Sequence, residues 1–373
     1  MLMEHFFILF VISALFLCTE IIVHLQFFKL IPLAIASHKK PNLNTIVLAA
    51  DIGGTKINLA LCGFKNNSPQ ILSSAKYHSK DYTTIEVVIK EFLAANNSLK
   101  PTAICIGAAG PVHDNKVAFT NLSWQVDGAE IARETGIKNV AIINDLEATA
   151  YGIACLDTHD FYNLQTGDKN VKGNIAIVAP GTGLGEAGMY FDGQSYHPFA
   201  TEGGHTGFSP TTEIDIELLQ YLQQQNKVVS CEHVVSGPGI FSIYQFLRDI
   251  KNMDEPQWLT EAFLTGDKTA TISKAAIENK AKICVQTMQL FVKYLAQETT
   301  NLVLKFKATG GVYLGGGIPP KILPLLQQTT FLETFRQCDR MEELINSTPI
   351  NVVLNDQAAL LGAANFALFG FDI

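Results

Sequence analysis

The sequence is short of charged residues and of paired cysteines, and each shortage excludes a class of protein. Charged residues make up 17% of the 373 residues, the formal net charge is −8, and no run of Lys or Arg occurs. These features exclude a typical basic nucleic-acid interface. The 7 cysteines are scattered singly without a C-x-x-C pair, which fits free thiols in a reducing compartment better than disulfides or a zinc site. We therefore expect a cytoplasmic protein with no nucleic-acid partner.

The leading segment, residues 1–43, differs from the rest of the chain. Residues 6–18 are almost wholly apolar, but the uninterrupted apolar length is about a dozen residues, short of the roughly 20 that span a bilayer. A signal peptide carries positive charge before its apolar part, and Glu4 and His5 stand there instead. The segment is a membrane anchor facing the cytosol, a signal peptide, or upstream sequence translated from a misassigned start. We favour the last, because the domain pattern begins near Asn44. Only an anchor would bring membrane contact.

From Asn44 onward, strand-like and helix-like patterns are mixed, and no long linker interrupts them. Apolar strands that end in a glycine-rich loop or an acid are expected at residues 45–50, 140–144, 175–178 and 311–314. Strands followed by helices indicate an α/β protein, in which ligands bind beyond the carboxyl ends of the strands. Helical spacing farther along predicts one long helix from Ser273 to about Thr300.

The first loop combines a carboxylate, two glycines and a hydroxyl. Its residues are Asp51-Ile52-Gly53-Gly54-Thr55-Lys56. Adjacent glycines let backbone N–H groups face an anion, and a nucleotide phosphate with its Mg²⁺ needs a carboxylate and a hydroxyl nearby. The same residues also fit an ordinary hairpin turn.

Two later loops are glycine-rich as well. Gly181-Thr182-Gly183 follows a strand and offers a second phosphate cradle, or a plain β-turn. Gly315-Gly316-Gly317 would let the backbone approach a purine and ribose closely, or form a flexible loop. Both loops are consistent with a bound nucleotide.

Asp145 is an acid at the end of an apolar strand. A hydroxyl that attacks a γ-phosphoryl group must lose a proton, and a positioned carboxylate can accept it. The alternative is structural, because Asn144 or Asp145 before Leu146 is also good helix-capping chemistry.

Glu202 and His205 flank two glycines on one loop. Sugars need several converging donors and acceptors, because each hydroxyl is both. Two side chains three residues apart on a bent loop could bind neighbouring hydroxyls. A surface loop is the structural alternative, and a metal site is weakly supported by one His and one Glu.

Together these motifs resemble the bacterial glucokinase family, within the sugar kinase, Hsp70 and actin superfamily. The likeness runs from about Asn44 to the C-terminus, and the first 40 residues have no counterpart in it. The motifs occur in family order at Asp51–Lys56, Ile143–Glu147, Gly181–Gly185, Glu202–His205, Ser236–Gly239 and Gly315–Ile318.

The resemblance implies a two-domain, ribonuclease H-like α/β fold with an interdomain cleft. The small domain would comprise residues 44–144 plus 356–373, and the large domain residues 145–355. ATP with Mg²⁺ would lie between the glycine loops of the two domains, and D-glucose deeper in the cleft. The family also allows a homodimer.

The implied reaction is transfer of the γ-phosphoryl group of ATP to the 6-hydroxyl of D-glucose. Asp145 matches the family's catalytic base, and Asp51 would hold Mg²⁺ through water. The residues implied for glucose are Asn144, Glu202, His205 and Glu232. The residues implied for ATP are Asp51, Gly53, Gly54, Thr55, Lys56, Gly181, Thr182, Gly183, Gly315 and Gly316.

Three other functions stay open at this point. The protein could phosphorylate another hexose, such as mannose or an N-acetylated sugar. It could be a non-catalytic sugar-binding regulator of the same fold, although the intact Asp51, Thr55 and Asp145 argue against that. An actin-like or Hsp70-like ATPase would have no use for the pair of Glu202 and His205.

A related repressor and kinase family shares the opening motif. Its members carry a cysteine-rich zinc loop after the glycine-histidine motif, whereas the nearest downstream cysteine here is Cys231, which stands alone. No helix-turn-helix segment precedes Asp51. The resemblance therefore favours the zinc-free glucokinases.

Overall fold

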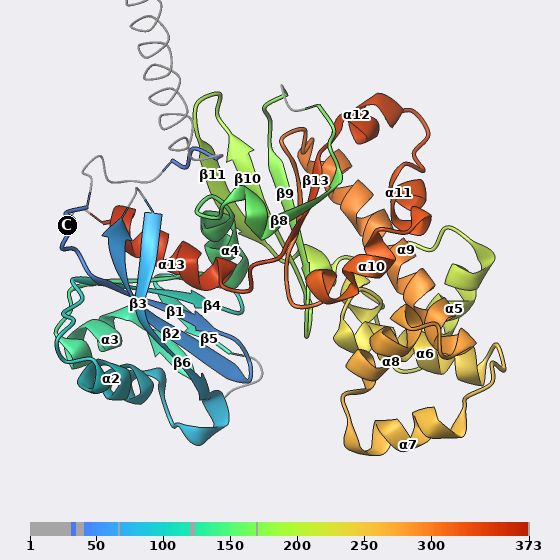
Figure 1. Cartoon of the computed structure of the whole chain (residues 1–373), viewed down its shortest axis with the longest axis horizontal. Helices are drawn as coiled ribbons and strands as arrows, with labels where there is room; N and C mark the ends of the chain where they lie inside the picture. Colours follow the sequence, from blue (N-terminus) through green and yellow to red (C-terminus); the bar gives the residue numbers. More distant parts are fainter. Residues whose placement is uncertain (1–30, 35–40, 66–67, 120–123, 169–170, 372–373) are drawn as a thin grey trace, which may run out of the picture.

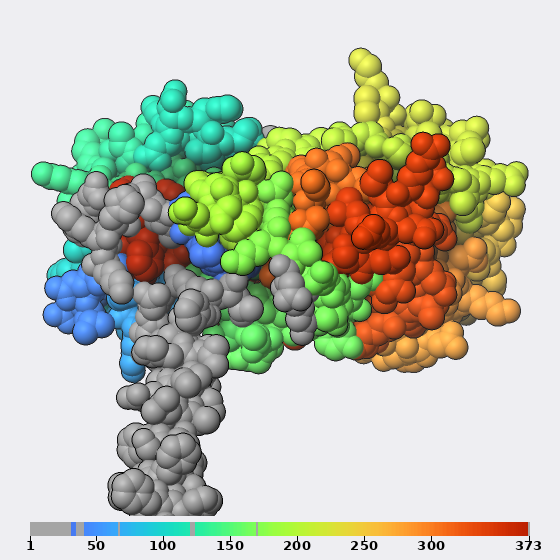
Figure 2. Space-filling view, turned by 90° about the horizontal axis from the view of Figure 1, so that it is seen from above, coloured from blue at the N-terminus to red at the C-terminus, as the bar shows by residue number. Residues whose placement is uncertain are grey.

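Two mixed β-sheets organise the computed structural model, which describes residues 31–34, 41–65, 68–119, 124–168 and 171–371 (Figure 1). One sheet has five strands in the order β3-β2-β1-β4-β7, and the other has six in the order β11-β10-β9-β12-β13-β8. The five-stranded half is blue to cyan in Figure 2, and it lies beside the other half, whose later helices are orange and red. The predicted α/β fold class is confirmed.

Helices cover both faces of the five-stranded sheet. Its strands are β1 (Val47–Ile52), β2 (Lys56–Lys65), β3 (Ser68–His78), β4 (Ala103–Ala108) and β7 (Asn139–Asn144). Because side chains alternate along a strand, Leu48 packs toward α2 (Ile85–Ala95) and α3 (Gly128–Thr135), and Val47 packs toward α13 (Ala358–Phe369). A short ribbon of β5 (Lys116–Ala118) and β6 (Gln125–Asp127) joins the first of these cores.

The six-stranded sheet lies between a helical layer and α4 (Asp145–Ile153). Its strands are β8 (Phe161–Gln165), β9 (Ile175–Pro180), β10 (Leu184–Phe191), β11 (Tyr196–Thr201), β12 (Gly311–Leu314) and β13 (Ile350–Val353). The helices beyond it are α5 (Glu213–Gln223), α6 (Gly237–Asp249), α7 (Gln257–Thr265), α8 (Lys268–Ile277), α9 (Lys282–Phe306), α10 (Leu323–Leu326), α11 (Thr329–Phe335) and α12 (Glu342–Ser347). Val178 faces the large core of this helical layer, whereas Ile177 faces α4.

Helices α4 and α13 pack backbone to backbone between the two sheets. A Cβ on Gly152 of α4 would overlap the main chain of Ala358, and a Cβ on Gly362 of α13 would overlap that of Ala148. Only glycine permits so close an approach. The helix that begins at Asp145 is thereby fixed against the helix that returns to the five-stranded sheet. The domain boundaries given above remain a prediction.

The single long helix expected from Ser273 to about Thr300 is wrong. Two helices, α8 and α9, occupy this region, and the chain turns between them at Asn279, whose φ is 54°. Asn tolerates the left-handed conformation better than most residues, so it ends α8 although the apolar spacing continues on both sides.

Residues 31–34 pack on the edge of the six-stranded sheet. The amide of Tyr196 donates a hydrogen bond to Pro32 O (2.8 Å), and the amide of Ala34 donates one to Tyr196 O (2.9 Å). Ile31 is buried in the core around α4, and Leu33 touches both that core and the core beneath α13. These residues therefore belong to the packed structure, although the sequence places the domain start near Asn44.

The rest of the leading segment, residues 1–30 and 35–40, lies outside the described residues. Its interpretations as an anchor, a signal peptide or a misassigned start stay predictions. Within the described part of the chain, no helix combines the length and apolarity needed to cross a bilayer.

Ile31→Ala should lower the free energy of unfolding by about 2–4 kcal/mol, because truncating a buried aliphatic side chain leaves a cavity. Ile31 is 4% exposed, whereas Leu43 in the same segment is 76% exposed, so Leu43→Ala is the matched control and should change stability by less than about 0.5 kcal/mol. Urea unfolding followed by circular dichroism measures both. Equal stability of the Ile31 variant and the parent would show that residues 31–34 do not pack on the core.

Candidate active site

The loops that the sequence singles out lie at the carboxyl ends of parallel strands. In the five-stranded sheet, Asp51 of β1 is in register with Gly107 of β4, which is in register with Ile143 of β7. In the other sheet, β9 and β12 are parallel, so Gly181 and Gly315 follow strands that end at one edge. The structure thus brings Asp51 and Asp145 to one sheet edge, and two glycine loops to the corresponding edge of the other sheet.

Asn144, not Asp145, caps helix α4. Asn144 Oδ1 accepts hydrogen bonds from the amides of Leu146 (2.9 Å) and Glu147 (3.3 Å), and its Nδ2 donates to Gly110 O (3.2 Å). The capping alternative is therefore correct for Asn144. Asp145 is the first helical residue, and its Oδ1 accepts a local hydrogen bond from the amide of Leu146 (3.0 Å).

The first turns of α4 touch both sheets. A Cβ on Gly107 would lie 2.9 Å from Ala148 Cβ, so glycine lets the helix rest directly on β4. On the other side, a Cβ on Gly185 of β10 would overlap the side chain of Leu146. Asp145 therefore sits at the junction of the two halves, as the interpretation of a shared site requires.

Two other carboxylates act on Asp145 at this junction. Burial raises the pKa of Asp145 to about 7, and the negative charges of Asp51 and, less strongly, Glu202 contribute to the rise. Burial also raises the pKa of Asp51, whose Oδ2 accepts a hydrogen bond from Asn58 Nδ2 (2.9 Å) that opposes the shift. A cation or a transferred proton would relieve this repulsion.

The Gly53 loop is a hairpin turn between β1 and β2. The amide of Gly53 donates to Lys56 O (3.0 Å), and the amide of Ser79 donates to Thr55 O (3.2 Å). A Cβ on Gly53 would meet its nearest atom at 3.7 Å, an ordinary contact. The fold therefore does not require glycine at position 53, and the space is free for a ligand. Thr55 and Lys56 are exposed.

The second glycine turn is supported from below by Glu232. Gly181 N donates to Gly183 O (2.8 Å) and closes the turn. Glu232 Oε2 accepts a hydrogen bond from the amide of Leu184 (2.9 Å) and fills the space that a side chain on Gly183 would need. Glu232 is half-buried. Glu232 therefore braces the turn from a partly buried position.

Glu202 and His205 stand open to solvent at the end of β11. Their side chains are 57% and 64% exposed, and Glu202 Oε2 lies 3.9 Å from His205 Nε2. The loop between them lies flat on β10, since a Cβ on Gly204 would overlap Leu184 O. Both side chains are therefore held on a backbone fixed by close packing, with their polar atoms available to a ligand.

A cavity of about 810 Å³ adjoins the Gly181–Thr182 turn. The N-terminus of α6, helix α8 and residues 317–322 form its other walls. Phe241, Ile277 and Ile318 are apolar walls, and Lys268 Nζ lies 4.5 Å from the centre of the Phe241 ring. This volume and lining suit a drug-sized organic ligand such as a purine nucleoside.

The triple-glycine loop is shaped by Gly316. Its φ is +76°, and a Cβ there would lie 2.6 Å from Pro180 O, so only glycine fits. Gly317 lines the cavity. The sequence motifs pointed to this wall of the cavity and to Gly237. They did not show that α8 lines the cavity, because the residues of α8 carry no signal beyond helical spacing.

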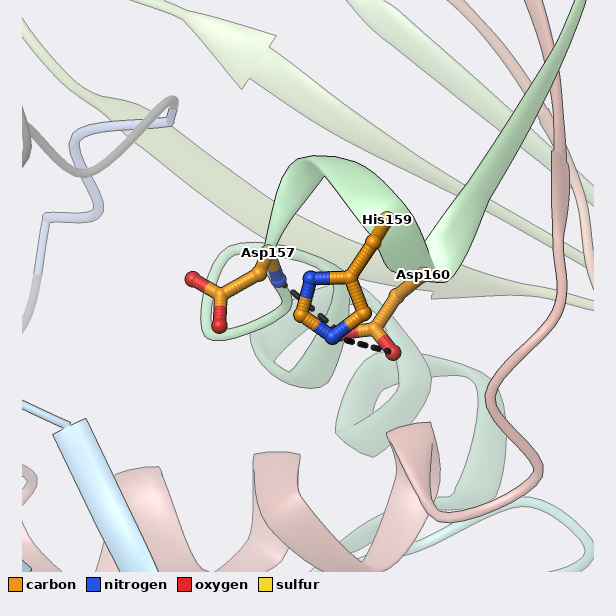
Figure 3. Close-up of side chains that lie close together, drawn as sticks. All are labelled: Asp157, His159 and Asp160. Carbon is orange, nitrogen blue, oxygen red and sulfur yellow. Dashed lines mark hydrogen bonds and ion pairs between the residues drawn. The ribbon is translucent and has the colours of Figure 1, made fainter.

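One other cluster of potential metal ligands lies outside this site (Figure 3). Ligand atoms of Asp157, His159 and Asp160 lie within 4.8 Å of one another. Asp160 Oδ2 accepts from the amide of Asp157 (3.0 Å), and Oδ1 accepts from Asn355 Nδ2 (3.1 Å). These bonds cap a surface turn and tie it to the end of β13, which accounts for the cluster.

Comparison with known proteins gives one consistent result. The glucokinase family model matches residues 48–368. The glucokinase of Trichormus variabilis is 39% identical over 335 residues, covering 86% of this chain and 98% of the relative. A crystal structure of glucokinase from an Antarctic psychrotroph is 30% identical with a TM-score of 0.74, covering 86% of this chain and 98% of that one.

A more distant structure agrees in fold alone. The ROK family glucokinase from Streptomyces griseus, in complex with glucose and AMPPNP, is 21% identical with a TM-score of 0.58. It covers 86% of this chain and 99% of its own.

The Asp145 carboxyl group should titrate near pH 7 rather than near 4, because it is buried beside Asp51. Asp51→Asn should lower this pKa more than Glu202→Gln does, since Asp51 contributes more of the repulsion. Carboxyl ¹³C NMR against pH measures the shift, and the signal is assigned by its loss in Asp145→Asn. A midpoint near 4 in the unliganded protein would contradict the burial of this group.

Proposed function

This chain belongs to the glucokinase family, and we propose that Asp145 is the general base of its reaction and that Asp51 holds Mg²⁺ through water. The reaction is the ATP-dependent phosphorylation of D-glucose at the 6-hydroxyl, a hexokinase-type phosphotransfer. The observation that supports these roles most directly is the position of Asp145 at the junction of the two sheets, next to Asp51 and Glu202.

Asp145 suits proton transfer because its neighbour takes the structural role. Asn144 satisfies the amides at the start of α4, so the Asp145 carboxylate is not needed to hold the helix. A pKa of about 7 leaves a substantial fraction ionised near neutral pH and makes the carboxylate a stronger base than an ordinary aspartate. Because phosphoryl transfer has a loose transition state, orienting the hydroxyl matters more than deprotonating it early.

Glucose would be bound by side chains from three loops. Glu202 and His205 offer an exposed carboxylate and imidazole on one rigid loop. Glu232 binds the amide of Leu184 through Oε2, so its Oε1 is available to a sugar hydroxyl. Asn144 Nδ2 donates one of its two hydrogens to Gly110 O, so the other is available to the sugar. Sugar hydroxyls donate and accept, so this mixture of groups fits them.

ATP would place its base in the cavity beside α8 and its phosphates on the two glycine turns. The apolar walls and Gly317 suit a purine and ribose. The turns at Gly53–Lys56 and Gly181–Gly183 offer backbone N–H groups and the hydroxyls of Thr55 and Thr182. Gly315 and Gly316 allow the chain to pass close to the nucleotide.

The residues present fit Mg²⁺, which is common to phosphoryl transfer. Asp51 accepts the hydrogen bond of Asn58 through Oδ2, so its Oδ1 is available to a water of the ion. Mg²⁺ in such sites keeps several of its waters. The mutual repulsion of Asp51 and Asp145 gives a dication a favourable place. When bound, the ion supplies neutralisation of phosphate charge. We also propose a cytoplasmic location, where ATP is available, and we leave a homodimer as an expectation.

Specificity for glucose over other hexoses is tested by coupled detection of ADP release with ATP and Mg²⁺ present. Glucose should give the highest kcat/KM in a set that includes mannose and N-acetylglucosamine. A higher value for another sugar would reassign the substrate, and ADP release independent of any sugar would favour an ATPase. If no hexose is phosphorylated, the result would favour a non-catalytic sugar-binding regulator.

Asp145→Asn should lower kcat for glucose by roughly 10²–10⁴, the range for a lost general base. Glucose binding and the thermal midpoint should stay near those of the parent, because Asn144 keeps the helix cap. Steady-state kinetics, fluorescence titration with glucose and thermal melting check the three parts. Near-normal turnover would remove Asp145 from the mechanism.

Gly53→Ala should leave the thermal midpoint unchanged, because a Cβ there makes only an ordinary contact at 3.7 Å. The KM for ATP should rise by about 10- to 100-fold, since crowding a ligand by one methyl group costs roughly 1–3 kcal/mol. The KM for glucose is the internal control and should change little. An unchanged KM for ATP would mean that phosphates do not pack on this turn.

A further inference from the structure

A buried acid, Glu186, lies directly beneath the loop that carries Glu202 and His205. Glu186 is in β10 and is 1% exposed. A Cβ on Gly203 would overlap Glu186 Oε2, so the carboxyl group packs against the backbone of Gly203. Among the described residues, neither carboxyl oxygen of Glu186 has a hydrogen-bond partner. An ionised carboxylate in that position would be costly.

Glu186 is also tied to the same loop through Thr201. The two residues are in register across β10 and β11. Thr201 Oγ1 donates to Glu186 O (2.8 Å) and accepts from the amide of Gly203 (3.1 Å). Glu186 thus holds the loop at two points. Its main-chain oxygen is linked to Gly203 through the hydroxyl of Thr201, and its carboxyl group packs against Gly203.

The groups around Glu186 favour its neutral form. Helix α9 presents Glu298, which is 3% exposed, with Lys305 Nζ 3.5 Å from Glu298 Oε1. The short helix η4 (Cys231–His233) presents Cys231, whose Sγ donates to Glu298 Oε2 (3.2 Å). Above lie Glu202 and His205. The ammonium group of Lys305 therefore pairs with Glu298 rather than with Glu186, and the charge of Glu298 acts on Glu186 more strongly than that of Lys305 does.

The physical consequence is a neutral carboxyl group near pH 7. Burial, followed by the charge of Glu298, raises the pKa of Glu186 to about 8, and Lys305 opposes the rise. Burial raises the pKa of Cys231 to about 12, so its thiol does not titrate in the same range. Above pH 8 the ionised Glu186 needs water or a counter-charge. The strands behind it are hydrogen-bonded in the sheet, so the contact between Glu186 and Gly203, which holds the loop while Glu186 is neutral, is the one that changes.

We propose that Glu186 is a positioning residue for glucose binding, and that its neutral carboxyl group supports Gly203 and so holds Glu202 and His205 in place for the sugar. The inference rests on the proposed binding role of that pair. Ionisation of Glu186 displaces the loop and lowers the fraction of protein that can bind glucose. Because the carboxyl group of Glu186 packs on Gly203 of the sugar loop, the KM for ATP should change less than the KM for glucose.

The test is the pH dependence of the KM for glucose, with kcat and the KM for ATP as readouts of other roles. If the ionised form does not bind, about a tenth of the protein is competent at pH 9, and the KM should rise about tenfold between pH 7 and pH 9. In Glu186→Gln, a neutral isostere, the KM at pH 7 should match the parent and should stay flat to pH 9. Glu217→Gln, on the surface of α5, is the matched control and should keep the rise.

A second variant keeps the test informative if Glu186→Gln does not fold. Glu298→Gln removes the neighbouring charge, so the rise should begin at lower pH. Calorimetric titration of glucose without ATP should give the same pH dependence as the KM. A parent KM that is flat from pH 7 to pH 9, or a rise that persists in Glu186→Gln, would overturn the proposal. Absence of glucose phosphorylation at pH 7 would instead overturn the proposed function.

Discussion

The arrangement of the site depends on one helix cap. The side chain of Asn144 accepts the hydrogen bonds of two amides at the start of α4, and this fixes the direction in which the chain leaves β7. Without the cap, Asp145 would be drawn into the same structural role, since aspartate caps helices as well as asparagine does. Dividing the work between neighbours leaves a carboxylate at a helix start, held by a rigid scaffold and available for chemistry.

Close backbone packing carries this arrangement from one sheet to the other. Gly107 lets α4 rest on β4, Gly185 accommodates Leu146 from the other sheet, and Gly152 lets α13 approach α4. At each of these positions a Cβ would push the helix away. Residues 31–34 add a further link, because Leu33 touches the cores on both sides. Small shifts at these contacts would change the distance between the carboxylates and the glycine turns.

Charge is the second constraint on the site. The charges of Asp51 and Glu202 act against ionisation of the buried Asp145, and the charge of Glu298 acts in the same way on the buried Glu186. Such groups destabilise the folded protein unless they stay protonated or meet a cation. At Asp51 and Asp145 the proposed Mg²⁺ would provide that cation, whereas the buried Glu186 stays protonated near pH 7.

Local order along the chain was enough to predict part of this molecule. Strand ends, the glycine loops and the motifs that show the family all follow from residues that are close in sequence. Only the tertiary structure decided which of Asn144 and Asp145 is the cap, that Glu232 braces the turn at Gly183, that Asn279 divides a helix, and that α8 lines a cavity. The contact of Glu232 and the lining of the cavity depend on partners many residues away, and the break at Asn279 depends on a backbone angle. The cap bonds are local, but Asn144 and Asp145 are equally good capping residues, so the sequence does not choose between them.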